Sequence, residues 1–568
     1  MIKRLLIIAF FILSITASAQ DLSSAQLDSI YNLYTFLRGL SSSQALQKQV
    51  ESKPEIKKCG TGLVSQLKSN LNYFSIEQQT VLSKILQRPI LPNSFLSPGG
   101  FFRIHYTDSG TDAVQYDINQ FAIAMDSAYR FEVNYLGYPA PPSDGTAGGD
   151  GAYDVYVRNL GNLYGQTSSE NIVSTSRWTS YMEVDNDFAG FYTQGINAAR
   201  VTAAHEFQHA IQMGNYAPQT GGSAIRNSDI FFYEITSTAM EEFVYDSIND
   251  YYAYMSDYFR NPAVPLPKNN GYNLAVWNIF LKDVFGFGVL KRQWELMPTI
   301  DALTAINNSI VEAGSKFGRV LNEFGTWTHF TNTRSISGKY FEEAANYPLI
   351  TPTSTINFSP PQQTYNMNIG PTANYFLKVN LPGGDGTFIS LVSNSDIQKA
   401  IENPNQVFDF SVSLFNDDVS GNQILNDKYS LTFNRQNQPN WNNAGILNNI
   451  VVYSDSSGSV PDAADKMYFY PSPFRYSNVN GKEIRIVFDA AKLSQNEIDF
   501  YVYSTSLLLV YNNKASVLNS YTKNSKNYYE IIWDGKDNNQ NKLASGVYLV
   551  IIKIDSDIKT GKLVIFND

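Results

Sequence analysis

The sequence predicts an α+β domain that is preceded by a small helical segment and followed by two all-β sandwich domains. Residues 21–90 place apolar side chains at helical spacing. Strand-like runs begin near residue 101, and helical patterns follow them up to about residue 345, an order typical of α+β domains. Beyond Pro348, apolar and polar residues alternate between turn-rich stretches, as in β-sandwiches.

Turn signals and shifts in composition set the expected boundaries. With 568 residues, a chain of this length is expected to form several domains of about 150 residues each. The helical segment covers residues 20–97 and ends in a Pro/Gly-rich connector. The α+β domain covers 98–345, the first sandwich 346–460 and the second 461–568. The two β-rich parts could also be halves of one larger sandwich.

The first residues have the pattern of an export signal. Lys3 and Arg4 precede the apolar run Leu5–Leu13, and small residues follow at Ala17–Ala19. The run is too short to cross about 30 Å of hydrocarbon, and no later stretch reaches about 18 uninterrupted apolar residues. We therefore expect a signal peptide at residues 1–19, secretion to the exterior or the cell surface, and no integral membrane span.

Charge and cysteine content narrow the classes of function. The formal net charge of −10 becomes more negative when Lys3 and Arg4 are removed with the signal. A surface with this charge repels phosphates, which argues against a nucleic-acid partner. Cys59 is the only cysteine, so no intramolecular disulfide is available and stability must come from packed cores and bound ions.

The pattern His205-Glu206-Phe207-Gln208-His209 predicts a zinc site on a helix. Two histidines four positions apart project from one helical face, where both imidazoles can reach one tetrahedral Zn²⁺. A carboxylate at position 206 stands beside the open position of such a metal, where it can act as a general base. The alternative is a pair of hydrogen-bonded core histidines.

A third ligand is expected from the next helix. Glu234 opens an amphipathic helix in an aromatic setting, and a buried carboxylate there needs a cation such as the metal. A helix-capping role for Glu234 is the alternative. Glu241 is the second candidate, or else an acceptor for a ligand imidazole. His329 is a more distant candidate.

Cys59 lies in the helical segment upstream of the connector, and thiolate is a strong zinc ligand. It could fill the fourth zinc position in a latent precursor until residues up to about 95 are removed, or it could be a buried cysteine that packs as a small hydrophobe. His105 is expected to be a structural histidine in a strand.

A peptide-cleaving site also needs an edge strand for substrate and a group that stabilises the oxyanion. The strand Ser180–Val184 is the expected edge because it precedes the metal helix. Candidates for the oxyanion are four tyrosines that are better explained as packing residues: Tyr233, Tyr245, Tyr251 and Tyr252.

The His-Glu-x-x-His pattern, followed by Tyr233-Glu234 with Thr236 and Met240-Glu241, resembles the gluzincin metallopeptidases. The similarity is to secreted bacterial metalloproteases with immunoglobulin-like C-terminal modules, and it covers roughly residues 55–345. It implies a zincin-like domain in which His205, His209 and Glu234 bind zinc and Glu206 is the general base.

The last domain contains Tyr470-Pro471-Ser472-Pro473-Phe474 and Trp533-Asp534-Gly535, then Gly546-Val547-Tyr548. It resembles the immunoglobulin-like domain of flagellar hook-capping proteins, which recurs in cargo of type IX secretion. This similarity implies export machinery or surface attachment as a partner. Calcium binding by Asp534, Asp537 and Asn539 is an alternative to a hydrogen-bonded turn.

These observations together predict a secreted, zinc-dependent metalloendopeptidase, made as a zymogen, that hydrolyses peptide bonds of extracellular proteins. One alternative is a surface adhesion or carbohydrate-binding protein with a degenerate metal domain. Another is a metal hydrolase that acts on a different bond.

Overall fold

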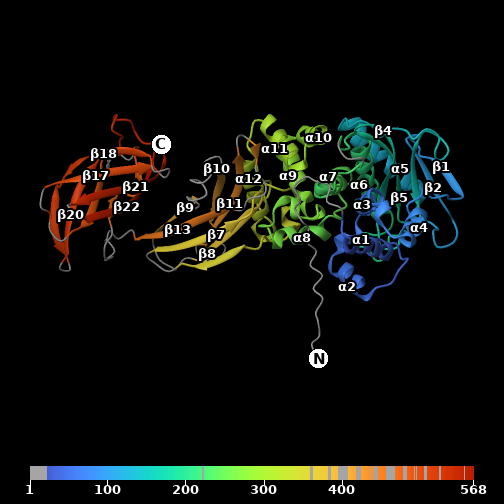
Figure 1. Ribbon diagram of the computed structural model, residues 1–568, viewed down its shortest axis with the longest axis horizontal. Helices are drawn as coiled ribbons and strands as arrows, with labels where there is room; N and C mark the ends of the chain where they lie inside the picture. Colours follow the sequence, from blue (N-terminus) through green and yellow to red (C-terminus); the bar gives the residue numbers. More distant parts are fainter. Residues whose placement is uncertain are drawn as a thin grey trace, which may run out of the picture. The chain divides into compact units, whose positions relative to one another are not determined.

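The computed structural model describes residues 22–358 apart from 220–222. It also describes 362–567 apart from 381–385, 395–406, 417–423, 436–437, 440–444, 456–466, 478–482, 491–492, 494–495, 505–507, 524–525 and 555–556. The expected signal peptide lies outside the described residues. The chain divides into two compact units, Met1–Ser454 and Asp455–Asp568. The first mixes helices and sheets, and the second is β-rich (Figure 1).

Four short helices form the N-terminal segment: α1 (Ser24–Leu37), α2 (Gln44–Ser52), α3 (Thr61–Ser69) and α4 (Ile76–Ile85). Capping boxes at Ser23 and Ser75 satisfy the first backbone N–H groups of α1 and α4. The apolar faces of these helices share a small core with Leu160 and Leu163 of the following domain. The segment is therefore packed against that domain.

A five-stranded mixed sheet follows, in the order β1-β2-β3-β5-β4. Its strands are β1 (Asn93–Leu96), β2 (Phe102–Tyr106), β3 (Tyr153–Val157), β4 (Gly165–Ser174) and β5 (Arg177–Val184). Strand β1 is antiparallel to β2, and β4 is antiparallel to β5; the other pairs are parallel. The expected connector thus contains a strand of this sheet.

The expectation that Ser180–Val184 forms the sheet edge is wrong. Strand β5, which contains these residues, pairs with β3 on one side and with β4 on the other. The hairpin between β4 and β5 places β4 outermost, so β4 is the edge that can accept another extended chain.

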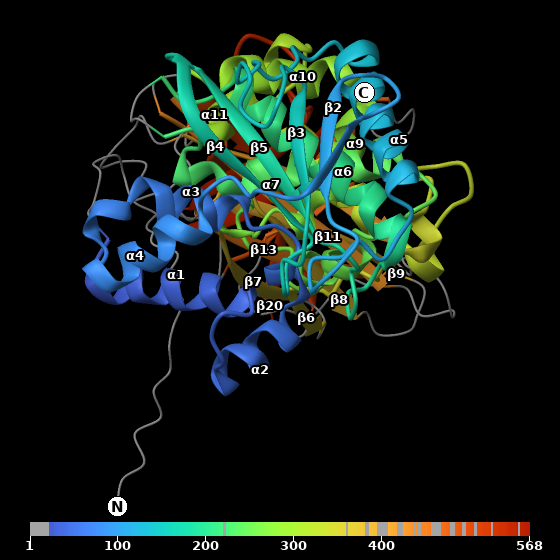
Figure 2. The ribbon, with the colours of Figure 1, turned by 90° about the vertical axis from the view of Figure 1, so that its right-hand side faces the viewer.

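Helix α6 (Gly195–Asn215) packs between this sheet and helix α7 (Ile230–Val244), and it also contacts α5 (Ile118–Tyr129). Figure 2 shows strands β2, β3, β5 and β4 in front of these helices, with α3 beside β4. Fully buried alanines along α6, among them Ala199, Ala203 and Ala210, allow its close approach to both neighbours.

The remaining helices extend the same core: α8 (Tyr252–Arg260), α9 (Ala275–Phe285), α10 (Phe287–Leu296), α11 (Ala302–Glu312) and α12 (Phe317–His329). Among the described residues, no single helix has both the length and the apolarity to cross a membrane. The helix pair Tyr272–Phe285 and Phe287–Leu296 reaches them only jointly, with a bend of 118°.

Two sheets complete the first unit. One has the order β10-β11-β8-β6 with β12 beside β11, and the other has the order β7-β13-β9. Their strands are β6 (Ser354–Asn357), β7 (Gln362–Ile369), β8 (Asn374–Asn380), β9 (Gly386–Asn394), β10 (Val407–Asn416), β11 (Ile424–Arg435), β12 (Gln438–Pro439) and β13 (Gly445–Asp455).

The second unit also has two sheets, in the orders β14-β16-β20-β19 and β15-β22-β21-β17-β18. Its core includes Ile486, Phe500, Trp533 and Val550. The strands are β14 (Tyr468–Tyr470), β15 (Phe474–Arg475), β16 (Ile484–Asp489), β17 (Glu497–Ser504), β18 (Leu509–Ser516), β19 (Asn519–Lys523), β20 (Lys526–Trp533), β21 (Gly546–Ile554) and β22 (Asp557–Phe566).

Phe207 joins α6 to the sheet, and its truncation tests this packing. The fully buried ring meets Phe102 edge to face, with 5.1 Å between ring centroids, and it also contacts Tyr129. We expect Phe207→Ala to destabilise the first unit by about 3–5 kcal/mol through lost burial and a cavity. Thermal unfolding followed by tryptophan fluorescence measures this loss. Ile123→Ala, at a half-exposed position of α5, is the control and should change stability by less than about 0.5 kcal/mol.

Candidate metal centre

Helix α6 brings His205 and His209 together inside the domain. One helical turn separates them, their ring centroids are 4.9 Å apart, and the exposed fraction of each side chain is 1% or less. The N-terminal half of α7 faces them with Glu234, which is also buried. Glu234 Oε2 lies 3.2 Å from His205 Nε2 and 3.3 Å from His209 Nε2.

Cys59 completes a group of four potential ligands. One donor atom from each of Cys59, His205, His209 and Glu234 lies within 4.8 Å of the other three. Ligands of a tetrahedral Zn²⁺ are about 3.3–3.6 Å apart, because each is about 2.0–2.3 Å from the ion. The buried cluster could therefore hold a metal ion, and its nitrogen, sulfur and oxygen donors are of the types that zinc accepts. It is the one such group among the residues that the structure describes.

Two buried atoms at this cluster lack hydrogen-bond partners within the described part of the chain. They are Glu206 Oε1 and His209 Nε2, and the nitrogen has only the 3.3 Å ion-pair contact with Glu234 Oε2. A buried nitrogen or oxygen without a partner is costly, and a cation between the ligands would give His209 Nε2 its partner. The residues present thus fit a zinc ion.

The other nitrogen of each imidazole is held in place. Glu241 Oε1 lies 2.7 Å from His205 Nδ1. Gln212 Oε1 lies 2.7 Å from His209 Nδ1, with Ser237 Oγ at 3.2 Å. Such contacts fix the ring orientation and tautomer of metal-binding histidines.

The electrostatics of the cluster couple proton binding to metal binding. Burial opposes the charged form of His205, but hydrogen bonds to Glu234 and Glu241 outweigh it and raise the pKa of the imidazole to about 9. Burial, then the nearby Glu206 and Glu234 carboxylates, raise the pKa of the Cys59 thiol well above its usual value. A metal must displace these protons to bind, so its affinity should rise with pH.

Glu206 lies fully buried next to the cluster. Its Oε2 accepts hydrogen bonds from Thr167 Oγ1 at 2.7 Å and Thr61 Oγ1 at 3.2 Å. Gly165, at the start of β4, makes room for it, since a Cβ there would lie 2.8 Å from Glu206 Cγ. Strand β4 and helix α6 therefore meet at this carboxylate.

Residues 57–61, which join a 3-10 helix ending at Lys57 to α3, pass beside the start of β4. Tyr164 N donates to Lys57 O at 3.0 Å, and Gly60 N donates to Gly165 O at 2.9 Å. Thr167 N donates to Thr61 Oγ1 at 2.8 Å. Cys59 and Gly165 form a parallel bridge, so the N-terminal segment covers the edge beside the cluster.

The other histidines lie outside the cluster. His105 Nε2 is 2.7 Å from Asp154 Oδ1, and its ring stacks on Tyr156. His329 Nδ1 is 3.0 Å from Arg334 Nη1. Both have partners of their own in other parts of the domain.

The four candidate tyrosines also lie elsewhere. Tyr233 packs on Trp294, Tyr245 donates to Ala124 O, and Tyr251 and Tyr252 pack on Tyr347.

Tyr272 is the tyrosine at the site that the sequence did not single out. Its ring stacks on His205, with 6.1 Å between centroids. Burial, then the charge of Glu234, raise the pKa of its phenol well above the usual value. Gly271 adopts φ +96°, and a Cβ there would lie 2.4 Å from Phe231 O. No local pattern distinguishes Tyr272 from the other 36 tyrosines of the chain.

The Asp/Asn-rich loop of the second unit forms hydrogen-bonded turns. Asp537 Oδ1 accepts from Asn539 N at 2.9 Å and from Asn541 N at 2.8 Å, and Asp534 Oδ1 accepts from Lys536 N at 3.1 Å. Both aspartate side chains accept hydrogen bonds from backbone N–H groups, as in ordinary Asx turns.

Comparisons with known proteins add little. No family model and no curated protein matches the chain. Among solved structures, it is similar to PorZ, an essential bacterial surface component of the type-IX secretion system of Porphyromonas gingivalis. That similarity covers 28% of this chain and 16% of the PorZ chain, at 16% identity and a TM-score of 0.14. A match this weak carries no argument about function.

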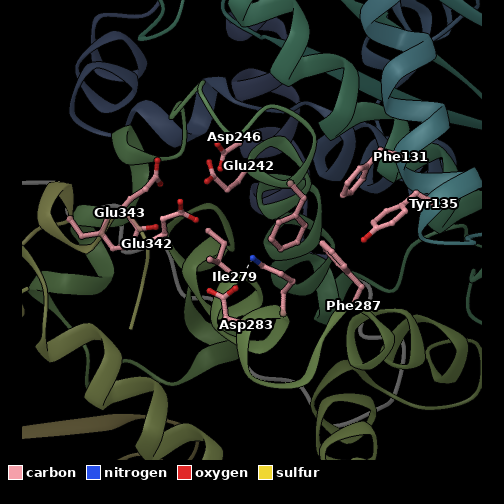
Figure 3. A pocket seen from close by; sticks show the side chains of 12 residues that line it. Phe131, Tyr135, Glu242, Asp246, Ile279, Asp283, Phe287, Glu342 and Glu343 are labelled. Atoms are coloured by element: carbon pink, nitrogen blue, oxygen red, sulfur yellow. Dashed lines mark ion pairs between the residues drawn. The ribbon is translucent and has the colours of Figure 1, made fainter. Parts of the chain in front are cut away.

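A separate pocket of about 280 Å³ lies beyond the C-terminal half of α7. Figure 3 shows Phe131, Tyr135 and Phe287 on one side of it and carboxylates, including Glu242 and Glu343, on the other. Glu242 is 8% exposed, and its Oε2 has no hydrogen-bond partner among the described residues. Burial, then repulsion from Glu343 and Asp246, raise the pKa of Glu242 to about 9.

This shift predicts a pH-dependent stability. The pKa of Glu242 is near 9 in the folded state and about 4.3 in the unfolded chain. Between these pH values the folded protein keeps a proton on this carboxyl that the unfolded chain has released, so the free energy of unfolding falls as pH rises towards 9. We expect Glu242→Gln to stabilise the protein at pH 8 by at least about 1 kcal/mol and to have little effect at pH 4. Thermal unfolding at the two pH values measures the difference. Glu342→Gln, at an exposed position of the same pocket, is the control; equal effects of the two variants would contradict the assignment.

Proposed function

We propose that the chain is a secreted zinc-dependent endopeptidase with the ligand set of gluzincins, acting on extracellular proteins. One observation carries the proposal. His205, His209 and Glu234 converge on one point, and a second carboxylate, Glu206, is buried beside them. The mixed sheet with α6 and α7 packed behind it supports a zincin-like catalytic domain.

The residues of the chain have distinct tasks in this proposal. His205, His209 and Glu234 hold zinc, and Glu241, Gln212 and Ser237 orient the two imidazoles. Zinc bound there would supply a Lewis acid for the peptide carbonyl and the attacking water. Glu206 takes a proton from that water and returns it to the leaving amine. Strand β4 offers its edge to an extended substrate.

Cys59 keeps this site latent. Its thiolate would be the fourth ligand of a bound metal, and Thr61 Oγ1 donates to the Glu206 carboxylate. The same segment occupies the edge of β4. Ligand position, general base and substrate edge are thus all blocked by residues 59–61.

Activation requires a cut downstream of this segment. Ile90 is 97% exposed and lies between Arg88 and Pro92, just ahead of β1. Exposed loop tips are preferred sites of proteolysis. A cut in the stretch 89–92 would leave β1 in the catalytic sheet, whereas a cut near residue 95 would divide that strand.

Location and attachment follow from the two ends of the chain. The signal-like residues 1–19 direct the chain out of the cytoplasm. The C-terminal domain serves sorting or attachment at the cell surface, a role that rests on its resemblance to hook-capping and type IX domains.

Glu206→Gln separates the enzyme from a metal-binding adhesion protein. We expect it to retain zinc, because Glu206 is not among the four converging ligands, and to lose about 10²–10⁴-fold in casein cleavage. Glu234→Gln should lose both zinc and cleavage. Elemental analysis and a cleavage assay give the two measurements.

Glu323→Gln, at an exposed position of α12, is the control and should behave like the wild type. Cleavage by Glu206→Gln at the wild-type rate would refute its role as base. Zinc binding without any cleavage by the wild type, even after a cut in the stretch 89–92, would favour the adhesion alternative.

Cys59→Ala tests latency. Because Cys59 is the only cysteine, a thiolate-to-metal charge-transfer absorption in the Co²⁺-loaded full-length chain reports this residue alone. We expect the wild type to show this absorption, and Cys59→Ala to lack it and to have higher precursor activity. A wild-type chain that binds Co²⁺ without the absorption would exclude Cys59 as a ligand.

A further inference from the structure

Lys58 is the most deeply buried cation near the metal cluster. Its side chain is 1% exposed, and Nζ lies 2.9 Å from Glu241 Oε2 and 2.5 Å from Asp250 Oδ2. The rings of Tyr164 and Tyr254 flank the ammonium, with their centroids at 4.5 and 5.6 Å. The lysine therefore fills a pocket made for an alkylammonium group.

The pocket walls belong to the catalytic domain, whereas the occupant does not. Glu241 comes from α7, Asp250 from the turn after it, Tyr254 from α8, and Tyr164 precedes β4. The hydroxyls of Tyr164 and Tyr254 both donate to Asp250, each at 3.1 Å. These contacts hold the pocket in shape from within the domain.

The pocket adjoins the proposed reaction centre. Glu241 contacts Lys58 through Oε2 and His205 through Oε1. Lys58 immediately precedes Cys59, whose sulfur lies among the metal ligands. A residue whose side chain fills this pocket is thus the direct neighbour in sequence of the residue that faces the proposed metal position.

Departure of the N-terminal segment changes the charge of this pocket. Without Lys58, the carboxylates of Glu241 and Asp250, both 0% exposed, lose their cation in a low-dielectric setting. Leaving buried charges uncompensated is strongly unfavourable. Another cation must enter or the site must rearrange.

We propose that the Lys58 pocket is a substrate subsite that accepts a Lys or Arg side chain beside the scissile bond. Lys58 is its built-in occupant in the precursor. This inference rests on the proposed peptidase function and adds the class of substrate. A neutral side chain would leave both carboxylates without an ammonium partner, and an acidic one would add repulsion, so the pocket selects by charge.

The first test examines the pocket without relying on activity. We expect full-length Lys58→Ala to have a lowered Tm that n-butylammonium restores in a saturable manner and n-butanol does not. Adding Asp250→Asn should abolish the restoration. Lys57→Ala, at the partly exposed neighbouring position, is the matched control and should not respond to the amine. Equal effects of amine and alcohol would overturn the charge-selective pocket.

The second test examines selection of substrate. Full-length Lys58→Ala/Cys59→Ala, in which both occupying side chains are shortened, is assayed on N-acetylated peptides that differ only by lysine or norleucine at one position. We expect at least a tenfold higher kcat/KM for the lysine peptide, and a smaller ratio after Asp250→Asn. Glu206-dependent cleavage without this preference would overturn the subsite and leave the peptidase standing. Cleavage only of peptides with a free N-terminus would also overturn the subsite, because the pocket would then bind the α-amino group of the substrate. Absence of any Glu206-dependent cleavage by this double variant, even after a cut in the stretch 89–92, would overturn both proposals.

Discussion

The balance of buried charge around His205 is the constraint on which the rest of this structure depends. Glu206, Glu234, Glu241 and Asp250 are each at most 2% exposed. Buried carboxylates need cations or several hydrogen bonds to remain ionised. Lys58 pairs with Glu241 and Asp250, the two imidazoles contact Glu234, and two threonine hydroxyls donate to Glu206. The proposed catalysis, latency and substrate selection therefore all depend on this one group of buried charges.

Close packing gives these charges their positions. Helix α6 is held between the sheet and α7 by small side chains, and Phe207 anchors it to β2 and β3. Gly165 and Gly271 let backbone approach Glu206 and Glu234 where a Cβ would lie within 3 Å of either residue. The site is therefore rigid on the side of the ligands. The side that changes in the proposed activation is the segment from the N-terminal helices.

In the proposed latent form, three side chains from residues 58–61 close the site. Lys58 neutralises the pocket beside His205, Cys59 meets the metal ligands, and Thr61 holds Glu206. Cys59 forms a parallel bridge with Gly165, so the start of the β4 edge is covered beside the cluster. Because separate groups are engaged at once, loss of one contact would weaken the block without removing it.

The sequence by itself indicated mixed α and β structure, the strand at 180–184 and the helix with two histidines four apart, because these depend on local periodicity. Glu234 could be predicted as a ligand because it is a carboxylate in the aromatic opening of the next helix, and the structure brings it to both histidines. Tertiary structure alone decided that β4 forms the edge, that Tyr272 lies on His205, and that Asp250 meets Lys58 across 192 positions of chain. Strand order and long-range ion pairs depend on how distant segments pack, and no local pattern records that.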